Sequence, residues 1–402
     1  MNMLPLAGVR ILDLGRVVAA PFATQLLADL GADVIKVERP GKGDLSREYG
    51  PSYFDLPDGS SASGLYLSVN RNKKSVTIDI GSSTGRALIL ALAAKCDVLV
   101  ENFKTGDLDK KGLGYGDVAA VHPGIVYCSI TGFGHTGPYA RHPATDVVFQ
   151  SMSALMSVTG EADGAPQRAG IAVSDLVGGL YAANAIQAAL RARDHDGRGQ
   201  HIDLSLLDCS VAAMSARAAD YFITGDIPVR TGNFAAGVAP AQLFECRDGL
   251  LNVQAGTDAQ FHKLCAVVDR LDLVPDPRFA SSASRVRHAK DLIPIFEQIF
   301  AQNTVLFWYE KLVDSGVICS PIYDMAGTFE DPQVKSRGLR STLRRHDGVS
   351  LDFVRNPIRF SKTPIDHYSF PPAVGEHTDQ VLAEVLEMTS AEIEALRSAG
   401  AV

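Results

Sequence analysis

The side chain best placed for chemistry is a carboxylate at the start of a long helical stretch. The segment 170–179 reads Gly-Ile-Ala-Val-Ser-Asp-Leu-Val-Gly-Gly and places Asp175 where the chain enters this helix. Backbone N–H groups and the positive end of the helix dipole would keep this carboxylate ionised, and Gly178 and Gly179 would leave room for a substrate. Asp175 is therefore a candidate nucleophile. The position also fits a plain helix N-cap, which stabilises a helix by about 1 kcal/mol, and the local sequence leaves both interpretations open.

Cationic side chains form a second set of candidates, because many of them lie close to the ends of predicted strands. Ligands of open α/β sheets bind outside the carboxyl ends of the strands. Together, in an acidic chain, these cations indicate a site for a polyphosphate anion, although each one taken singly also fits a solvated surface charge. They are Lys36, Arg39, Arg71, Lys73, Lys74, Lys104 and Arg141.

The elements that would position these residues alternate between short β-branched runs and longer helical patterns, which is typical of a parallel sheet with crossover helices. The predicted strands are 9–14, 33–38, 76–80, 97–101, 125–131 and 201–204, and the predicted helices are 21–30, 84–94 and 175–193. Pro21 at a helix start and Gly31 after its end give the usual punctuation of a βαβ unit. The turn from Gly15 to Pro21 lacks the G-x-G-x-x-G pattern, so it does not indicate dinucleotide binding.

The character of the chain changes at about residue 225. A Gly/Ala-rich loop at 231–241 precedes a predicted strand at 250–254 and predicted helices at 259–271, 290–301 and 304–315, the last with Asn303 as its N-cap. The tail returns to strands around 351–360 and closes with a helix at 377–398. We therefore expect a large domain over 1–224, a smaller α+β domain over 225–325, and a C-terminal segment, 326–402, that returns to the large domain.

Composition and charge exclude several classes of protein. The 402 residues include 38 Lys+Arg and 46 Asp+Glu, a net charge of −8, with 46% hydrophobic residues, which is an ordinary globular balance. The chain lacks the basic excess used to bind phosphate backbones, so we expect no nucleic-acid partner. The six cysteines have no metal-ligand spacing, and we expect reduced thiols and no metal. With no signal peptide and no apolar run of about 18 residues, we expect a cytoplasmic protein with no membrane partner.

Seven motifs follow one another in an order that resembles a known family. They are Leu-Ala-Gly-Val-Arg-Ile-Leu-Asp-Leu (6–14), Leu-Gly-Ala-Asp-Val-Ile-Lys-Val-Glu-Arg-Pro (30–40), Asn-Arg-Asn-Lys-Lys-Ser (70–75), Glu-Asn-Phe (101–103), Gly-Phe-Gly-His-Thr-Gly-Pro-Tyr (132–139), Gly-Arg-Gly-Gln (197–200) and Gly-Glu-His-Thr (375–378). Each is weak alone, but the ordered series is specific and spans nearly the whole chain. The sequence resembles the class III CoA-transferases, which include formyl-CoA and carnitine-type CoA-transferases.

The resemblance implies an α/β fold with a Rossmann-like parallel sheet in the large domain, a smaller α+β domain, and an interlocked homodimer. It implies that Asp175 is catalytic and forms a mixed anhydride and then an aspartyl-CoA thioester. It implies an acyl-CoA and a carboxylic acid as substrates, with no bound cofactor. The CoA contacts that it implies, completed by Arg141 from the basic set, are Arg16, Val17, Arg39, Lys73, Asn102, Phe103 and Arg141.

Further positions bear on which reaction the resemblance implies. Asp146 matches an acidic residue that the family places near the nucleophile, and Thr145 replaces the Tyr that usually precedes it. The α-methylacyl-CoA racemases share this architecture and use a His/Asp pair, but their His would fall at position 145. Thr145 therefore favours CoA transfer over racemisation. His135 stands where relatives mostly carry Gln, and it fits a polar loop residue as well as a functional one.

The acceptor acid is the least determined part of the prediction. Formyl-CoA:oxalate members carry Gln at the position of Val18 and a glycine-quartet loop where this chain has residues 232–237, which argues against oxalate. Segments 68–75 and 125–132 resemble the succinyl-CoA:glutarate branch, whose dicarboxylate acceptor needs a cation that Arg168 or Arg230 would supply. A CoA-binding protein without turnover is a further alternative, but it would not need a carboxylate at 175.

Overall fold

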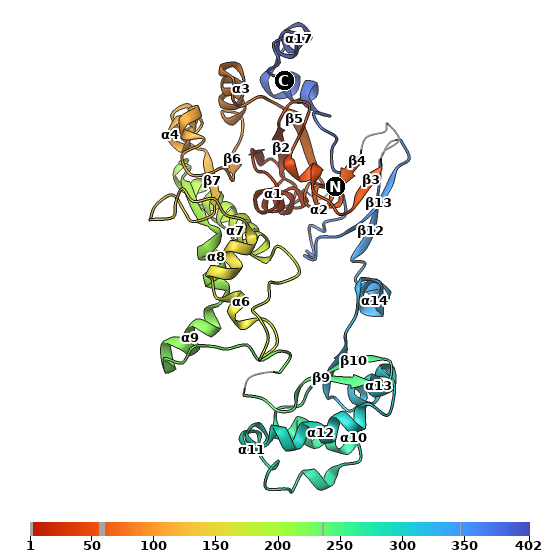
Figure 1. Ribbon diagram of the computed structural model, residues 1–402. Helices are drawn as coiled ribbons and strands as arrows, with labels where there is room; N and C mark the ends of the chain where they lie inside the picture. Colours follow the sequence, from red (N-terminus) through yellow and green to blue (C-terminus); the bar gives the residue numbers. More distant parts are fainter. Residues whose placement is uncertain (1–2, 56–60, 235–236, 346) are drawn as a thin grey trace. The chain divides into compact units, whose positions relative to one another are not determined.

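The computed structural model describes residues 3–55, 61–234, 237–345 and 347–402 and divides into two compact units (Figure 1). The first unit comprises Met1–Leu155, Arg168–Gly225 and Arg337–Val402. The second comprises Met156–Gln167 and Asp226–Ser336. The first unit therefore carries both ends of the chain, and the segment 156–167 belongs with the second.

A six-stranded parallel sheet forms the centre of the first unit, in the order β5-β2-β1-β6-β7-β8. Its strands are β1 (Arg10–Asp13), β2 (Asp33–Glu38), β5 (Lys73–Thr77), β6 (Val98–Glu101), β7 (Val126–Thr131) and β8 (His201–Ser205). Numbered along the sheet, this is the doubly wound order 3-2-1-4-5-6, in which the winding reverses between β1 and β6. The predicted α/β class with a Rossmann-like sheet is confirmed.

Helices cover both faces of this sheet, and neighbouring residues of each strand point to opposite faces. Ile11 lies in a core with α1 (Ala19–Asp29), α5 (Asp146–Met152), α7 (Val173–Asp196) and α8 (Leu206–Ala213). Leu12 lies in a second core with α3 (Ser83–Ala93), α4 (Tyr115–Val121), α16 (Thr378–Leu386) and α17 (Ser390–Ser398). The C-terminal helices thus complete the first unit, at the end of the sheet formed by β5 (Figure 1).

The second unit has an antiparallel sheet with helices packed on it. Its strands lie in the order β11-β10-β9, and Phe244, Phe296 and Phe300 form part of its core. The elements are α6 (Leu155–Val158, beginning at the unit boundary), β9 (Ala241–Cys246), β10 (Gly249–Gln254), α10 (Asp258–Val267), η3 (Leu271–Leu273), α11 (Ser282–Arg287), α12 (Ala289–Phe300), α13 (Val305–Asp314), β11 (Ile318–Pro321), α14 (Met325–Glu330) and α15 (Pro332–Ser336).

Shorter elements complete the first unit. They are η1 (Leu45–Glu48), β3 (Tyr53–Asp55), β4 (Ser61–Ser63), α2 (Gly64–Val69), η2 (Asp109–Lys111), α9 (Ser215–Thr224), β12 (Arg340–Arg344) and β13 (Ser350–Val354). Within the described part of the chain, no helix is both long and apolar enough to cross a membrane, and no group of three or more His, Cys, Asp or Glu side chains could hold a metal ion.

Several predicted boundaries were wrong for identifiable reasons. Strand β5 begins at Lys73, three residues before the predicted start, because the Lys73 side chain is buried at its ammonium as well as its stem. The closing helix is two helices, since Glu387 adopts a left-handed conformation (φ 58°) and Thr389 caps a new helix. Helix α13 is capped by Thr304 and not by Asn303. Helix α10 ends at Val267, four residues before the predicted end.

Candidate active site

Two loops meet where the winding of the sheet reverses, one after β1 and one after β6. The backbone N–H of Arg16 donates to Asn102 Oδ1 (2.8 Å), and Asn102 Nδ2 donates back to the Arg16 carbonyl (2.7 Å). The Arg16 guanidinium lies 4.0 Å from the centre of the Phe103 ring, a cation–π contact. The structure therefore brings together three of the residues predicted to contact CoA, at the edge where doubly wound sheets bind nucleotides.

A pocket opens beside these loops and is lined in part by Arg16, Arg39, Lys42, Asp79 and Phe103. Over the described ranges, neither Arg39 nor Lys42 forms an ion pair or a side-chain hydrogen bond. Three cations, two of them without a protein partner, thus face one pocket at the carboxyl ends of the strands. This arrangement suits a polyanionic ligand.

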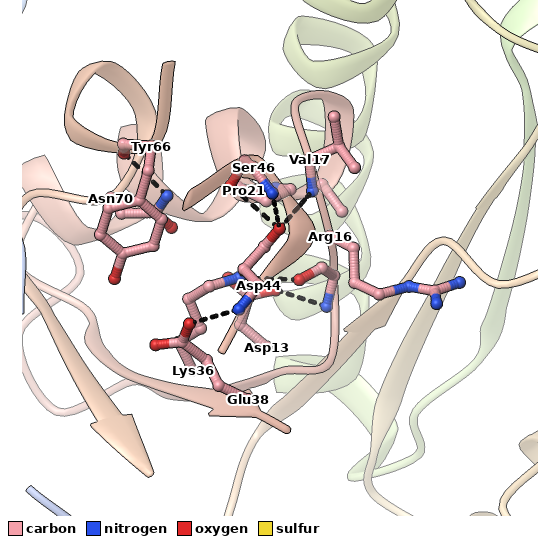
Figure 2. Close-up of polar contacts among 12 residues, drawn as sticks. Asp13, Arg16, Val17, Pro21, Lys36, Glu38, Asp44, Ser46, Tyr66 and Asn70 are labelled. Atoms are coloured by element: carbon pink, nitrogen blue, oxygen red, sulfur yellow. Dashed lines mark hydrogen bonds and ion pairs between the residues drawn. The ribbon is translucent and has the colours of Figure 1, made fainter. Parts of the chain in front are cut away.

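A buried carboxylate, Asp44, supports the first loop from below (Figure 2). It accepts hydrogen bonds from the Lys36 ammonium (2.7 Å), the Ser46 N–H (2.8 Å) and the Val17 N–H (3.2 Å). Burial alone would raise the pKa of Asp44, but the Lys36 charge and these hydrogen bonds lower it to about 2. Figure 2 also shows the Arg16 side chain pointing away from this cluster.

Three cations of the predicted polyphosphate site serve a different purpose. The Lys73 ammonium is fully buried and donates to Asp13, to the Pro21 carbonyl and to Asn70, which uses all three of its N–H groups. Lys36 pairs with Asp44, and Arg71 pairs with Asp29. In the described structure each of these three cations is therefore paired with a buried carboxylate.

Asp175 is the third residue of helix α7 (Val173–Asp196), and its interpretation as an N-cap was wrong. The cap position is Ala172, which makes no side-chain capping bond. In the part of the chain that the structure describes, the half-buried Asp175 carboxylate has no hydrogen-bond or ion-pair partner. Burial and, next, the charge of Asp146 raise the pKa of Asp175 to about 7. The effect of burial and of Asp146 on this pKa is opposite to the effect that we expected from the helix N-terminus, which would keep the carboxylate ionised.

The glycines after Asp175 allow helices to pack closely and do not open a path for substrate, so that expectation was wrong. A Cβ atom at Gly179 would lie 2.9 Å from the Ala19 carbonyl oxygen and 2.8 Å from Phe22 Cδ1. One at Gly178 would lie 2.2 Å from Leu206 Cδ2. Helix α7 therefore approaches the backbone of α1 directly.

The predicted substrate-adjacent residues occupy different environments. Asp146 begins α5 and accepts the Ser174 N–H (2.8 Å), so it contacts the first turn of α7. Thr145 is exposed and makes no side-chain capping bond. Arg168 is exposed and, within the described residues, has no ion-pair partner. Val18 is buried just before α1.

Two other predicted residues, Arg230 and Arg141, do not line this pocket. Arg230, in the second unit, donates to the carbonyls of Ser157, Glu161 and Gly164 and is occupied by them. Arg141 is exposed and does not line the pocket next to Arg16. The loop 231–241 includes 235–236, which lie outside the described residues.

Polar residues near the site that the sequence reasoning did not single out are Asp44, Glu101 and Gln150. Glu101 accepts the Phe103 N–H (2.7 Å) and a hydrogen bond from Ser129, and burial raises its pKa to about 7. It thereby fixes the loop that carries Asn102 and Phe103. Glu101 belongs to one of the seven motifs, so its position was visible, but its partners were not. The His135 Nε2 atom is buried and has no hydrogen-bond partner among the described residues.

Comparison with known proteins identifies the class to which this fold and site belong. The family model of CoA-transferase family III matches residues 6–378. The chain therefore belongs to CoA-transferase family III, and it is an enzyme that transfers CoA.

Two relatives and one solved structure are similar to this chain over most of its length. The chain is similar to a succinate–glutarate CoA-transferase of Agrobacterium fabrum, with 41% identity over 95% of this chain and 96% of that protein. It is also similar to the succinyl-CoA:glutarate CoA-transferase of Homo sapiens, with 42% identity over 100% of this chain and 90% of that protein. Its structure is similar to a CAIB/BAIF family protein from Brucella suis, with a TM-score of 0.88, 40% identity, and coverage of 96% of this chain and 100% of that one.

Proposed function

We propose that this enzyme transfers CoA from succinyl-CoA to a dicarboxylic acid of the glutarate type, with Asp175 as the covalent nucleophile. The observation that carries the assignment of the nucleophile is the isolation of the Asp175 carboxylate, which is half-buried and unpartnered in the described structure. A structural carboxylate in such a place would be paired or hydrogen-bonded. The names of the relatives support the donor and the acceptor.

The residues around the pocket have the chemistry to hold the CoA thioester. Arg16, Arg39 and Lys42 supply positive charge for its phosphates. The Phe103 ring and the Asn102 amide would contact the less polar pantetheine arm, whose amides need hydrogen-bond partners. In this proposal the other end of the substrate, the thioester, reaches Asp175.

In this proposal the transfer takes place in four steps at the Asp175 carboxylate. The Asp175 carboxylate attacks the thioester carbonyl of succinyl-CoA, which gives a mixed anhydride and releases CoA thiolate. The thiolate attacks the aspartyl carbonyl, which gives an aspartyl-CoA thioester and succinate. The acceptor carboxylate attacks this thioester, which gives a second mixed anhydride, between Asp175 and the acceptor, and again releases CoA thiolate. Attack of the thiolate on the acceptor's carbonyl yields the new acyl-CoA and restores the Asp175 carboxylate.

Arg168 is the cation that we assign to the distal carboxylate of the dicarboxylic acids. It lies seven residues before Asp175 in the sequence, in the same unit, and its guanidinium has no ion-pair partner within the described residues. Arg230, the other candidate, already binds three backbone carbonyls.

We also propose that the chain works as an interlocked homodimer. The family resemblance implies this assembly, and Phe222 and Ile223 at the end of α9 leave 80% and 83% of their surface exposed, as an interface would. Light scattering on the purified protein tests it, with a single species of one-chain mass as the contrary result.

The test of the reaction is a chromatographic assay with succinyl-CoA and a pool of acids that includes glutarate, malate, itaconate and oxalate. Wild-type protein should form new acyl-CoA species, and Asp175→Ala should form none while still binding CoA. Asp194→Ala removes an exposed carboxylate on the same helix and should keep full activity. Hydroxylamine should trap a stoichiometric hydroxamate on Asp175 in wild type incubated with succinyl-CoA alone. Wild-type rates in Asp175→Ala would contradict the assignment, and solvent deuterium uptake into a 2-methylacyl-CoA would instead support racemisation.

A further inference from the structure

Gln150 is a fully buried polar side chain close to the entrance of helix α7, and the transfer chemistry above does not use it. It lies on α5 (Asp146–Met152), one helical turn after Asp146. Its Nε2 atom donates to Asp146 Oδ2 (2.5 Å) and to the Ile171 carbonyl (3.4 Å), and its Oε1 atom accepts the Ala169 N–H (2.9 Å). The Gln150 amide thus links the Asp146 carboxylate to the backbone segment that precedes α7.

Asp146 extends the same set of contacts into the helix. Its Oδ1 atom accepts the N–H of Ser174, the residue before Asp175. The first turn of a helix leaves N–H groups without partners, and α7 has no side-chain cap of its own. Asp146 therefore acts as a cap supplied from a neighbouring helix, and Gln150 orients it.

The backbone between these contacts is tightly bent. Ala172 has φ −75° and ψ 66°, and the Val173 N–H donates to the Ile171 carbonyl (2.8 Å), which together form an inverse γ-turn. The same Ile171 carbonyl accepts from Gln150. This bend sets the direction in which α7 begins. Gln150 contacts the bend before Ala172, and Asp146 contacts it after Ala172.

We infer that Gln150 is a positioning residue of the Asp175 site, which fixes the segment 169–174 and the orientation of Asp146, and so sets where the Asp175 carboxylate and its neighbouring negative charge lie. Arg168 immediately precedes the segment and Asp175 immediately follows it. Gln150 thereby holds the segment that separates the proposed nucleophile from the cation assigned to the acceptor acid. The inference rests on the proposed function for the role of Asp175.

The experiment compares Gln150→Leu with Gln25→Leu. Gln25 is a matched control because it is also buried, and it too bonds the backbone, accepting from Arg71 and donating to Ser68, but on helix α1. We expect both variants to lose thermal stability. Only Gln150→Leu should lower kcat, by about a hundredfold, with KM for the acyl-CoA within about threefold, because a displaced nucleophile impairs the reacting geometry more than substrate binding.

A second readout does not depend on activity. Carbodiimide-driven labelling of Asp175 with an amine, followed by peptide mass spectrometry over a pH series, measures its titration in the unliganded protein. The midpoint should fall by more than half a pH unit in Gln150→Leu, as in Asp146→Asn, because an Asp146 freed from Gln150 turns toward water and repels Asp175 less. It should not move in Gln25→Leu.

The inference is overturned if Gln150→Leu keeps both kcat and the titration midpoint of wild type. Should Gln150→Leu fail to fold, Gln150→Glu keeps an acceptor for the Ala169 N–H, but it loses the donors and places a second carboxyl group against Asp146. An unchanged kcat in that variant would overturn the inference equally. A wild-type protein with no transferase activity would contradict the proposed function, and the titration would still decide the placement of Asp175.

Discussion

Val17 donates its backbone N–H to both carboxylate oxygens of Asp44, at 3.2 and 3.3 Å, while its own φ is +66°. A β-branched residue in this left-handed region is strained. The hydrogen bonds to a buried, charged acceptor offset that strain and hold the loop on which Arg16 faces the pocket. Because Asp44 is in turn neutralised by Lys36, the shape of the loop depends on a buried ion pair.

Replacing Asp44 with Asn should destabilise the fold by about 3–5 kcal/mol, because it leaves the fully buried Lys36 ammonium without its counter-charge. Urea unfolding at pH 7 measures this. Since the pKa of Asp44 is lowered to about 2, the stabilisation is present above pH 4 and is lost as the pH falls toward 2, so the difference from wild type should shrink in acid. Asp107→Asn, which breaks an exposed pair with Lys110, should cost less than about 1 kcal/mol. Equal losses in the two variants would contradict the role of the buried pair.

Val17→Gly should raise the melting temperature or leave it unchanged, because glycine adopts a positive φ without strain and this gain exceeds or balances its entropic cost. Val18→Gly is the matched control: Val18 is buried at a negative φ, so its loss should lower the melting temperature. Differential scanning calorimetry on both variants makes the comparison. A drop for Val17→Gly as large as that for Val18→Gly would show that the backbone at Val17 is unstrained.

Removing the pocket cations should weaken binding of the acyl-CoA and leave the chemical step nearly unchanged. We expect Arg39→Ala and Lys42→Ala each to raise KM by about tenfold, as charge-assisted contacts to phosphate would, and the effect to fade with added salt. Arg191→Ala, which removes an exposed charge on α7 that pairs with Asp194, should leave KM unaltered. Steady-state kinetics at two ionic strengths provides the test, and a fall in kcat at constant KM would place these cations elsewhere.

The rate of transfer should rise with pH through neutrality. In the proposed mechanism only the ionised Asp175 attacks. Burial together with the Asp146 charge raises its pKa to about 7, so kcat/KM should climb to a plateau above pH 8. Asp146→Asn keeps an acceptor for the Ser174 N–H but removes the charge, so its midpoint should move to lower pH. The profile of Asp194→Asn should overlay that of wild type. A midpoint near pH 4 in wild type would contradict the raised pKa of Asp175.

Because of Asp175, the free energy of unfolding should be lower at high pH than at low pH. Its pKa is higher in the folded than in the unfolded chain, so the folded state binds more protons between about pH 4 and 7 and loses stability as the pH rises through that range. Asp175→Asn avoids this loss, and it should melt about 1–3 °C above wild type at pH 8 but not at pH 4. Thermal unfolding at the two pH values decides, and a variant less stable than wild type at pH 8 would contradict burial as the cause of the shift.

The sequence predicted elements well where local signals agree. Strand β2 lies over Asp33–Glu38 as expected, because its apolar run is bounded by Gly31 and Pro40. The start of β5 was missed since Lys73 and Lys74 look like loop residues, and the buried charge of Asp13 that stabilises Lys73 in the strand comes from a distant segment. The break at Glu387 carries no glycine signal, so a single closing helix was the natural expectation.

The site was predictable in its identities but not in its contacts. Asn102 stands in one of the seven motifs, Asp175 was visible as a carboxylate at the start of a long helix, and Arg16 lies two residues after the first motif. The sheet order brings Arg16 and Asn102 together as its reversal requires. Which cations face the pocket was not predictable, because the carboxylates that occupy Lys36 and Lys73 come from other segments. Gln150 gave no signal at all, since its partners lie up to 21 residues away and two of them are backbone atoms.

The contact at Gly179 limits how closely helices α7 and α1 can approach each other. Asp175 lies one turn before it on α7, and Val18 immediately precedes Ala19 on α1, so the close approach of the two helices helps to set the separation between Asp175 and the first loop. An added methyl group at 179 would act as a spacer, because it would meet Phe22 and the Ala19 carbonyl and push the two helices apart. The separation that the proposed mechanism requires thus depends on the absence of a side chain at position 179.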